Sequence, residues 1–200
     1  MDSEDPGEVV FQVGSDRICR HGVAYRNQRI RWEDVRHLFV SGERITHNFM
    51  VPGGEEARLT FVSSSGQRID VRMSAWFRLG RDRQQQFADV YRYVVSQVLE
   101  RQYNWFKEKL DSGRRVSFKT FGIAPDGIYQ ETTFSGTKLF NLRQIVGSDV
   151  RDGNFYLAYL DANGKTKQHK LGALGKIPNI HVAEAFIIKV AEENRQKLSS

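Results

Sequence analysis

The chain has 200 residues, enough for one large domain or two small ones. Hydrophobic residues make up 40% of it and charged residues 27%, a balance that is typical of globular proteins and excludes a disordered chain. With 4 prolines and 1 cysteine, the composition excludes a collagen-like chain, a disulfide scaffold and a multi-cysteine zinc module. No stretch approaches the roughly 18–20 consecutive apolar residues that a membrane-spanning helix needs.

The first five residues are acidic and lack the basic region and the apolar core of a signal peptide. We therefore expect a reducing, cytoplasmic setting. The net charge is +6, and it is unevenly distributed: residues 1–111 carry +1 and residues 112–200 carry +5. The first part uses arginine almost exclusively, whereas the second prefers lysine. This difference predicts two units with separate surfaces, and the positive balance favours weak attraction to phosphate-rich partners.

Seven short strands are predicted in the first half, where apolar and polar residues alternate between turn residues. They are expected at 9–11, 17–20, 23–25, 29–32, 36–40, 59–62 and 69–73. Residues 29–32 show the period of two that marks a half-buried strand. The sequence Ser-Ser-Ser-Gly at 63–66 predicts a hairpin, and proline and glycine predict a loop at 51–55.

The hydrophobic period changes after Gly80 and predicts a helix over 82–110. Its apolar stripe consists of Phe87, Tyr91, Val94, Val98, Leu99, Tyr103, Phe106 and Leu110. The second half repeats this order, with strands expected at 116–118, 121–123, 128–129, 138–140, 144–146 and 155–160. Asn163 and Gly164 predict a hairpin turn, and a final helix is expected to start near Pro178 and Asn179.

The two halves share their landmarks although their identity is low. Gly22-Val23 matches Gly127-Ile128, Trp32-Glu33-Asp34-Val35 matches Leu142-Arg143-Gln144-Ile145, and Ser65-Gly66 matches Asn163-Gly164. An amphipathic helix closes each half. The pattern predicts an α+β fold of two tandem units, 9–110 and 116–198, each a curled antiparallel sheet of about seven strands closed by a C-terminal helix. This is the plan of a pleckstrin-homology-like (PH-like) barrel.

These landmarks, together with Ile177-Pro178-Asn179 before the last helix, resemble a mainly bacterial family of PH-like proteins catalogued as a domain of unknown function. The resemblance covers about residues 10–195. It departs from the family at Leu142, where a tryptophan is usual. It implies the fold and no activity.

The repeated residues have structural interpretations. Gly22 and Gly127 each precede a strand, where a tight turn needs a permissive backbone. Trp32 is expected to anchor a core, with a binding platform as the alternative. Asn179 is expected to start the last helix by accepting a hydrogen bond from its first N–H groups.

No catalytic or metal site is predicted. The five histidines, His21, His37, His47, His169 and His181, show no metal-binding spacing and no cysteine pairs support them. The phosphate-binding loop and nucleophile-elbow motifs are absent. We expect a protein that is not an enzyme and that uses no small-molecule cofactor.

One basic cluster stands out along three predicted strands and their loops. It consists of Arg17, Arg20, Arg26, Arg29 and Arg31, with a weaker patch of Lys165, Lys167 and Lys170 beside the second hairpin. Guanidinium groups suit phosphate because they donate two parallel hydrogen bonds, and in lipid-binding PH domains such residues clamp inositol phosphates. The alternative is a solvated arginine-rich strand face.

Two functions follow as expectations. The first is a non-enzymatic interaction module that binds another protein at an exposed sheet edge or a sheet–helix groove. The alternative is a peripheral module at the inner membrane face that binds anionic lipid headgroups through the basic residues. Nucleic acid is not expected as a partner, because no stacking aromatics lie in an RNA-binding frame.

Overall fold

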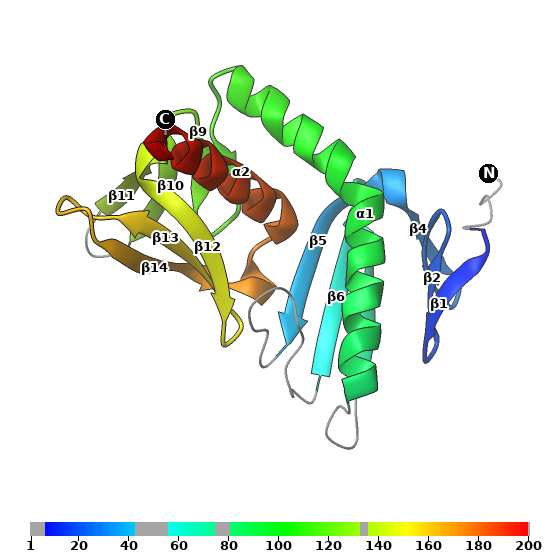
Figure 1. The fold of residues 1–200 in the computed structure, drawn as a ribbon. Coiled ribbons are helices and arrows are strands. Elements are labelled where there is room, and N and C mark those ends of the chain that lie inside the picture. Colours follow the sequence, from blue (N-terminus) through cyan, green and yellow to red (C-terminus); the bar gives the residue numbers. More distant parts are fainter. Residues whose placement is uncertain (1–6, 43–55, 75–80, 133–135, 200) are drawn as a thin grey trace.

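The computed structural model describes residues 7–42, 56–74, 81–132 and 136–199, and its fold is α+β (Figure 1). The first half contains β1 (Val9–Val13), β2 (Asp16–Cys19), β3 (Gly22–Tyr25), β4 (Gln28–Arg31), β5 (Val35–Gly42), β6 (Glu56–Ser63), β7 (Arg68–Ser74) and the helix α1 (Arg81–Asp111). The second contains β8 (Val116–Ser117), β9 (Gly122–Ala124), β10 (Gly127–Thr132), β11 (Gly136–Asn141), β12 (Ile145–Arg151), β13 (Asn154–Leu160), β14 (Thr166–Ala173) and α2 (Ile180–Ser199). Within these described residues, elements are joined by the 3-10 turns η1 (Trp32–Asp34), η3 (Leu142–Gln144) and η4 (Leu174–Lys176).

The strands form four small antiparallel sheets. Two have four strands, in the orders β1-β2-β3-β4 and β11-β10-β9-β8, and two have three strands, β5-β6-β7 and β12-β13-β14. The α+β fold with antiparallel sheets and two helices is thus confirmed. The loop predicted at 51–55 lies outside the described residues.

The single seven-stranded sheet predicted for each half is not what forms: each half divides its strands between two sheets, and no closed barrel forms among the described residues. A turn of 3-10 helix separates the sheets after β4 and after β11. Each half also has a second seam where its two sheets meet, between β2 and β7 or between β10 and β14. At these seams, side-chain hydrogen bonds take the place of a backbone ladder. Asp16 accepts from the backbone N–H of Arg72 at 3.3 Å, and Gln130 donates to the carbonyl oxygen of Leu171 at 2.9 Å.

The two hairpins that end the three-stranded sheets have the same hydrogen bonds. In the first, the N–H of Gly66 donates to the carbonyl of Ser63, and the Ser63 hydroxyl accepts from the N–H of Gln67. In the second, Gly164 donates to the carbonyl of Asp161, whose carboxylate accepts from the N–H of Lys165. Both glycines have positive φ, +85° and +73°, which L-residues rarely adopt. The matched landmarks therefore correspond to matched local structure.

The 3-10 turns are also anchored alike in both halves. Arg101 of α1 donates to the carbonyl oxygens of Trp32 and Val35 at 2.7 and 2.9 Å. Asn194 of α2 donates to those of Leu142 and Ile145, both at 2.8 Å. These four carbonyls belong to the segments that the sequence comparison paired. Each closing helix thus holds the turn between its own two sheets.

Gly22 and Gly127 are structural for a different reason from the predicted tight turn, because neither has a positive φ. A Cβ atom at Gly22 would lie 2.3 Å from the carbonyl oxygen of Ile30, and one at Gly127 would lie 2.5 Å from that of Phe140. The neighbouring strand approaches too closely for any side chain. Close backbone packing therefore explains both glycines.

Trp32 is buried, with 7% of its surface exposed, as its core assignment predicted. Its ring packs against Phe61 and Tyr93, at centroid distances of 5.9 and 6.4 Å. The indole N–H donates to the carbonyl oxygen of Arg20 at 3.1 Å, which satisfies the one polar atom of the side chain.

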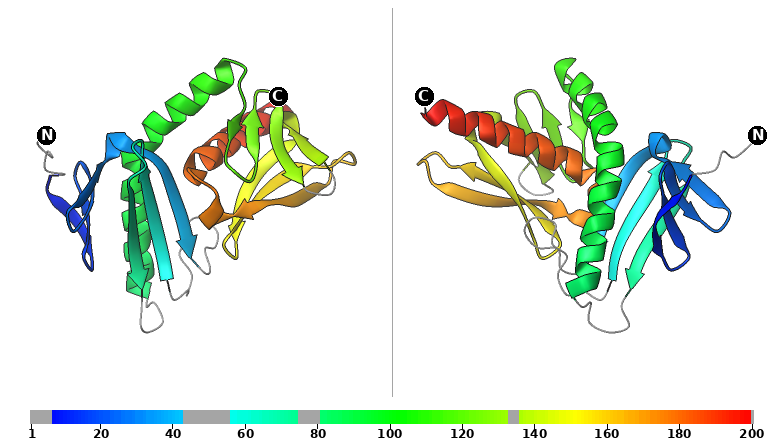
Figure 2. Two further views of the ribbon diagram at one scale, coloured as in Figure 1. Left: turned by 180° about the vertical axis from the view of Figure 1, so that it is seen from behind. Right: turned by 45° about the vertical axis from the view of Figure 1, so that its right-hand side comes forward.

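The long helix α1 serves both halves (Figure 2). Its residues Val90, Val94 and Val98 are buried in the first half's core. Further along, Phe106 packs against Phe118 at 5.9 Å and against Phe186 of α2 at 5.3 Å. One apolar stripe thereby joins the two sets of sheets.

Asn179 immediately precedes α2, and its side chain joins the two halves of the chain. Its side-chain oxygen accepts from the N–H of Leu38 in β5 at 2.8 Å, and its backbone N–H donates to the Leu38 carbonyl at 2.8 Å. Its amide nitrogen also donates to the carbonyl of Arg36 at 2.9 Å. The predicted side-chain cap is not made, although α2 begins at the next residue and the N–H of Val182 donates to the backbone carbonyl of Asn179 at 2.9 Å. Asn179, with φ of +52°, instead uses its side chain to continue the hydrogen-bonded edge of β5.

A buried polar pair reinforces this junction. Gln102 of α1 donates to the carbonyl oxygen of Val35 at 3.2 Å, and its own oxygen lies 2.6 Å from Nε2 of His181 on α2. Because the glutamine oxygen can only accept, Nε2 of His181 carries the proton. Among the described residues no group bonds Nδ1 of His181. Burial lowers the pKa of His181 to about 4.

Replacing Trp32 with alanine is expected to lower the free energy of unfolding by about 3–5 kcal/mol, as truncation of a buried aromatic residue does. Trp32→Phe, which keeps most of the ring contacts and loses the indole hydrogen bond, should cost less. Chemical denaturation measures both. A midpoint for Trp32→Ala equal to that of the parent protein would contradict the core assignment.

The α1–α2 junction is expected to contain two groups with opposite pH dependence. Folded His181 takes up a proton near pH 4 and unfolded histidine near 6.5, so this group lowers the free energy of unfolding as pH drops through that window. Burial raises the pKa of Glu184 to about 7, so this group lowers the free energy of unfolding as pH rises from 4.5 to about 7.

The contributions of His181 and Glu184 are separated by measuring denaturation across this pH range for three proteins: the parent, His181→Gln and Glu184→Gln. The stability of the parent minus that of His181→Gln should rise with pH between about 4 and 6.5. The stability of the parent minus that of Glu184→Gln should fall between 4.5 and about 7. Slopes of the same sign would refute the assignment.

Candidate functional site: a groove around Trp105

A groove of about 330 Å³ lies where α1 crosses the start of β5. Its lining residues come from η1, β5, the first hairpin, α1 and the segment before α2: Glu33, Asp34, Val35, Arg36, His37, Ser64, Arg101, Gln102, Trp105 and Asn179. A smaller hollow of about 50 Å³ continues it toward Phe106 and Val182, sharing Trp105 as a wall. The groove is therefore a product of the junction between the halves.

Trp105 is the most exposed large hydrophobic side chain in the described residues, at 52%. It follows Asn104 and precedes buried Phe106, so it lies beside the apolar stripe of α1 rather than in it. Lys109, one turn later, places its ammonium 5.8 Å from the indole ring. The sequence interpretation missed Trp105. The available signal was a tryptophan outside the stripe whose neighbours one turn away, Arg101, Glu108 and Lys109, are charged.

His37 borders the groove from β5 and is half-buried. Burial, reinforced by the charge of Arg36, lowers its pKa, so the ring is neutral at pH 7. Among the described residues no group bonds its Nδ1 atom. The imidazole thus presents a neutral aromatic ring to the groove that Trp105 also lines.

Arg101, one turn before Trp105 on α1, also lines the groove. Its bonds to the carbonyls of Trp32 and Val35 hold the guanidinium at the groove. Burial lowers its pKa, while the carboxylates of Asp34 and Glu33 act in the opposite direction. The walls of the groove therefore combine an aromatic face with fixed charges of both signs.

The predicted arginine cluster is only partly brought together. Arg17, Ala24 and Arg29 are direct cross-strand partners on β2, β3 and β4, so their side chains share one face of the sheet, opposite that of Ile18, Val23 and Ile30. Two strand spacings separate Arg17 and Arg29 by about 10 Å. Arg31 shares this face but pairs with Glu33 at 3.0 Å.

The two other arginines lie in turns. Arg26, with φ of +51°, follows β3 and places its guanidinium 5.1 Å from the ring of Tyr25. Arg20 follows β2 and is exposed. Neither belongs to the strand face of Arg17 and Arg29.

The lysine patch is not on one face. Lys165 lies in the β13–β14 turn. Lys167 and Lys170 pair with Tyr159 and Tyr156 in a regular stretch of β14, and three residues along a strand place side chains on opposite faces. The structure therefore separates Lys167 from Lys170.

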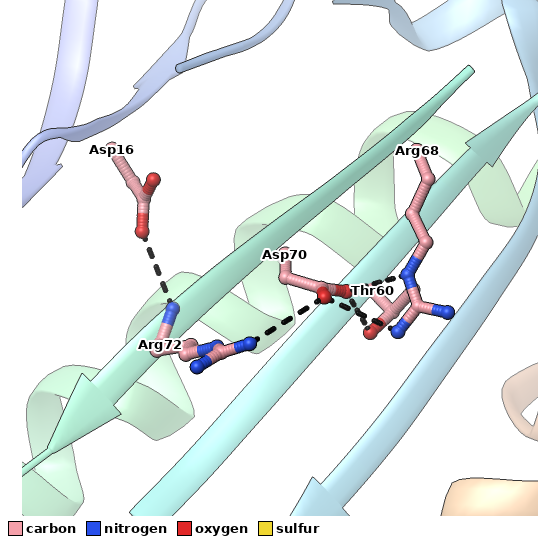
Figure 3. A network of polar contacts seen from close by, with 5 residues as sticks. All are labelled: Asp16, Thr60, Arg68, Asp70 and Arg72. Atoms are coloured by element: carbon pink, nitrogen blue, oxygen red, sulfur yellow. Dashed lines mark hydrogen bonds and ion pairs between the residues drawn. The ribbon is translucent and has the colours of Figure 1, made fainter. Parts of the chain in front are cut away.

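A second polar site, which sequence reasoning missed, lies on β6 and β7 (Figure 3). Asp70 accepts from Thr60 at 2.5 Å and from Arg68 at 3.1 and 3.2 Å, and Arg72 approaches it to 3.9 Å. These partners lower the pKa of Asp70 against the opposing effect of burial. A groove of about 510 Å³ runs beside this network. Because Asp70 already pairs with the arginines, the network stabilises the sheet face.

Within the described parts of the chain, no group of three or more His, Cys, Asp or Glu residues could hold a metal ion. None of the helices described is long and apolar enough to cross a membrane. Comparison with known proteins adds no family: neither a protein-family model nor a curated protein matches this chain.

Proposed function

We propose that the chain is a non-enzymatic interaction module of two tandem PH-like units, 9–110 and 116–198, that binds a partner protein at the Trp105 groove. The repeated order of four strands, a 3-10 turn, three strands and a helix supports the tandem arrangement. The observation that carries the binding function is Trp105, 52% exposed at the junction of the two halves.

Trp105 keeps about half of its large side-chain surface available for burial by a partner. Tryptophan is also among the residues that dominate binding energy at protein interfaces. The groove has a volume of about 330 Å³, at the low end of the range of about 300–1,000 Å³ for small-molecule pockets. This size suits an anchoring side chain of a partner, with the surrounding helix and turn as its rim.

The partner is expected to be a cytoplasmic protein that presents an apolar side chain to the indole and polar groups to Asp34 and Arg36. Both charged residues are exposed at the rim, so they would fix orientation more than affinity. No cofactor takes part.

Replacing Trp105 with alanine is expected to weaken partner binding at least about 30-fold, the equivalent of a 2 kcal/mol interface hot spot. Ile188→Ala is the matched control, because Ile188 is a 44% exposed residue on the other helix. Proteins captured by the parent chain are compared quantitatively with those captured by each variant. Each candidate is then purified and its Kd is measured directly.

A purified partner that binds the parent, the control and Trp105→Ala equally would refute the groove as the binding site. So would a partner that is lost equally from both variants. Thermal unfolding of the two variants establishes that the fold is retained.

Anionic surfaces are the second candidate, and the shared face of Arg17 and Arg29 is the observation that favours them. If this face binds headgroups, Arg17→Glu with Arg29→Glu should abolish sedimentation with phosphatidylserine vesicles at low salt, since each basic group contributes about 1 kcal/mol. Arg114→Glu with Arg143→Glu, an equal charge change at exposed residues elsewhere, should retain binding. Equal loss in both pairs, or no binding by the parent protein, would remove this candidate.

A further inference from the structure

Three rings surround an ammonium group in the second half of the chain. Lys138 of β11 places Nζ 4.9 Å from the ring centroid of Phe140 and 5.7 Å from that of Tyr159 on β13. The same Nζ lies 3.4 Å from Nδ1 of His169 on β14. Phe140 contacts both other rings, at 4.9 Å to each centroid and at interplanar angles of 68° and 43°. The rings therefore form adjoining walls rather than a stack.

A chain of hydrogen bonds determines the tautomer of His169. Gln130 donates its amide N–H to the backbone carbonyl of Leu171 at 2.9 Å, so its side-chain oxygen is the acceptor that remains. This oxygen lies 2.5 Å from Nε2 of His169, which must carry the proton. Nδ1 then presents its lone pair to Lys138. Burial and the charge of Lys138 lower the pKa of His169, which keeps the ring neutral at pH 7.

All three walls are therefore electron-rich on the side that faces the cation. The π-faces of Phe140 and Tyr159 attract positive charge through the ring quadrupole, and the imidazole contributes a lone pair. This arrangement is absent at the matching positions of the first half. Counted from the two hairpin glycines, Tyr159 corresponds to Phe61 and His169 to Val71, and both first-half residues are fully buried in the core.

We propose that Phe140, Tyr159 and His169 form a binding site for a quaternary ammonium group, which Lys138 occupies as an intramolecular competitor. This inference is independent of the Trp105 groove.

Lys138 is a displaceable occupant. The residue is exposed, and its 3.4 Å contact with His169 is long for a hydrogen bond. A primary ammonium is strongly hydrated and carries a flexible stem, whereas a trimethylated nitrogen matches aromatic walls with less loss of hydration. The apparent affinity for an external cation is reduced by the fraction of molecules in which Lys138 fills the site.

Titration of the isotope-labelled full chain with choline, followed by NMR at the Tyr159 and His169 rings, tests the proposal. Lys138→Ala should bind choline about tenfold more tightly than the parent protein, because the competitor is removed. The neutral carbon analogue 3,3-dimethyl-1-butanol should not bind either protein. Adding Tyr159→Leu to Lys138→Ala should remove the gain.

Lys167→Ala is the matched control. Lys167 is the cross-strand partner of Tyr159, so its removal deletes a neighbouring positive charge without emptying the site. An equal gain in Lys167→Ala would show a general charge effect and overturn the proposal, as would binding of the neutral analogue. Failure of choline to bind Lys138→Ala at tens of millimolar, with the amide spectrum of the folded protein retained, would also overturn it.

A second titration uses an acetylated tripeptide that contains Nε-trimethyllysine. Tighter binding of this peptide than of choline would identify a modified lysine of another chain as the source of the ammonium group. Equal or weaker binding would identify a free small molecule.

Discussion

The apolar stripe of α1 packs within one hydrophobic cluster that contains buried residues of both halves, and the rest of the architecture depends on it. A helix of 31 residues spans about 46 Å at 1.5 Å per residue, more than one small sheet pair can cover. Its valines fill the core of the first half, and Phe106 reaches Phe118 and Phe186 in the second. Because the helix backbone is continuous, the position of one half restricts that of the other.

The polar groups at this junction explain why one arrangement is selected. Apolar packing alone tolerates sliding, whereas the bonds of Asn179 to β5 and of Gln102 to Val35 and His181 require one register. Breaking such a bond leaves a buried donor or acceptor without a partner, at a cost of about 1–3 kcal/mol. These contacts also fix the shape of the groove around Trp105, because Asn179 and Gln102 both line it.

Local structure was largely predictable from the sequence, and long-range pairing was not. Both helices and most strands follow from hydrophobic periodicity, and the hairpins from Gly66 and Gly164. The strand β14 was missed because only Leu171 within it is fully buried, so no apolar alternation marks it. The division into four sheets was missed because it depends on pairing between distant strands, which periodicity does not encode.

The same contrast between local and long-range information applies to the candidate sites. Trp105 could have been noticed as a tryptophan outside its helix stripe, but its groove requires β5 and the segment before α2. The rings around Lys138 come from three strands, and no spacing in the sequence brings them together. The Asn179 side chain was expected to cap α2, because its observed partner, the N–H of Leu38, lies 141 residues away in the sequence.

The seams bridged by the side chains of Asp16 and Gln130 affect how each half opens transiently. A backbone ladder opens only when several bonds break together, whereas a seam bridged by single side chains can open by rotation of those side chains. Amide groups of β7 and β14 that face the seams therefore exchange hydrogen with solvent through small local fluctuations. Amides of the central strands β6 and β13, bonded on both edges, exchange only through larger unfolding events. In each three-stranded sheet, the edge strand at the seam, β7 or β14, is therefore expected to open before the central strand.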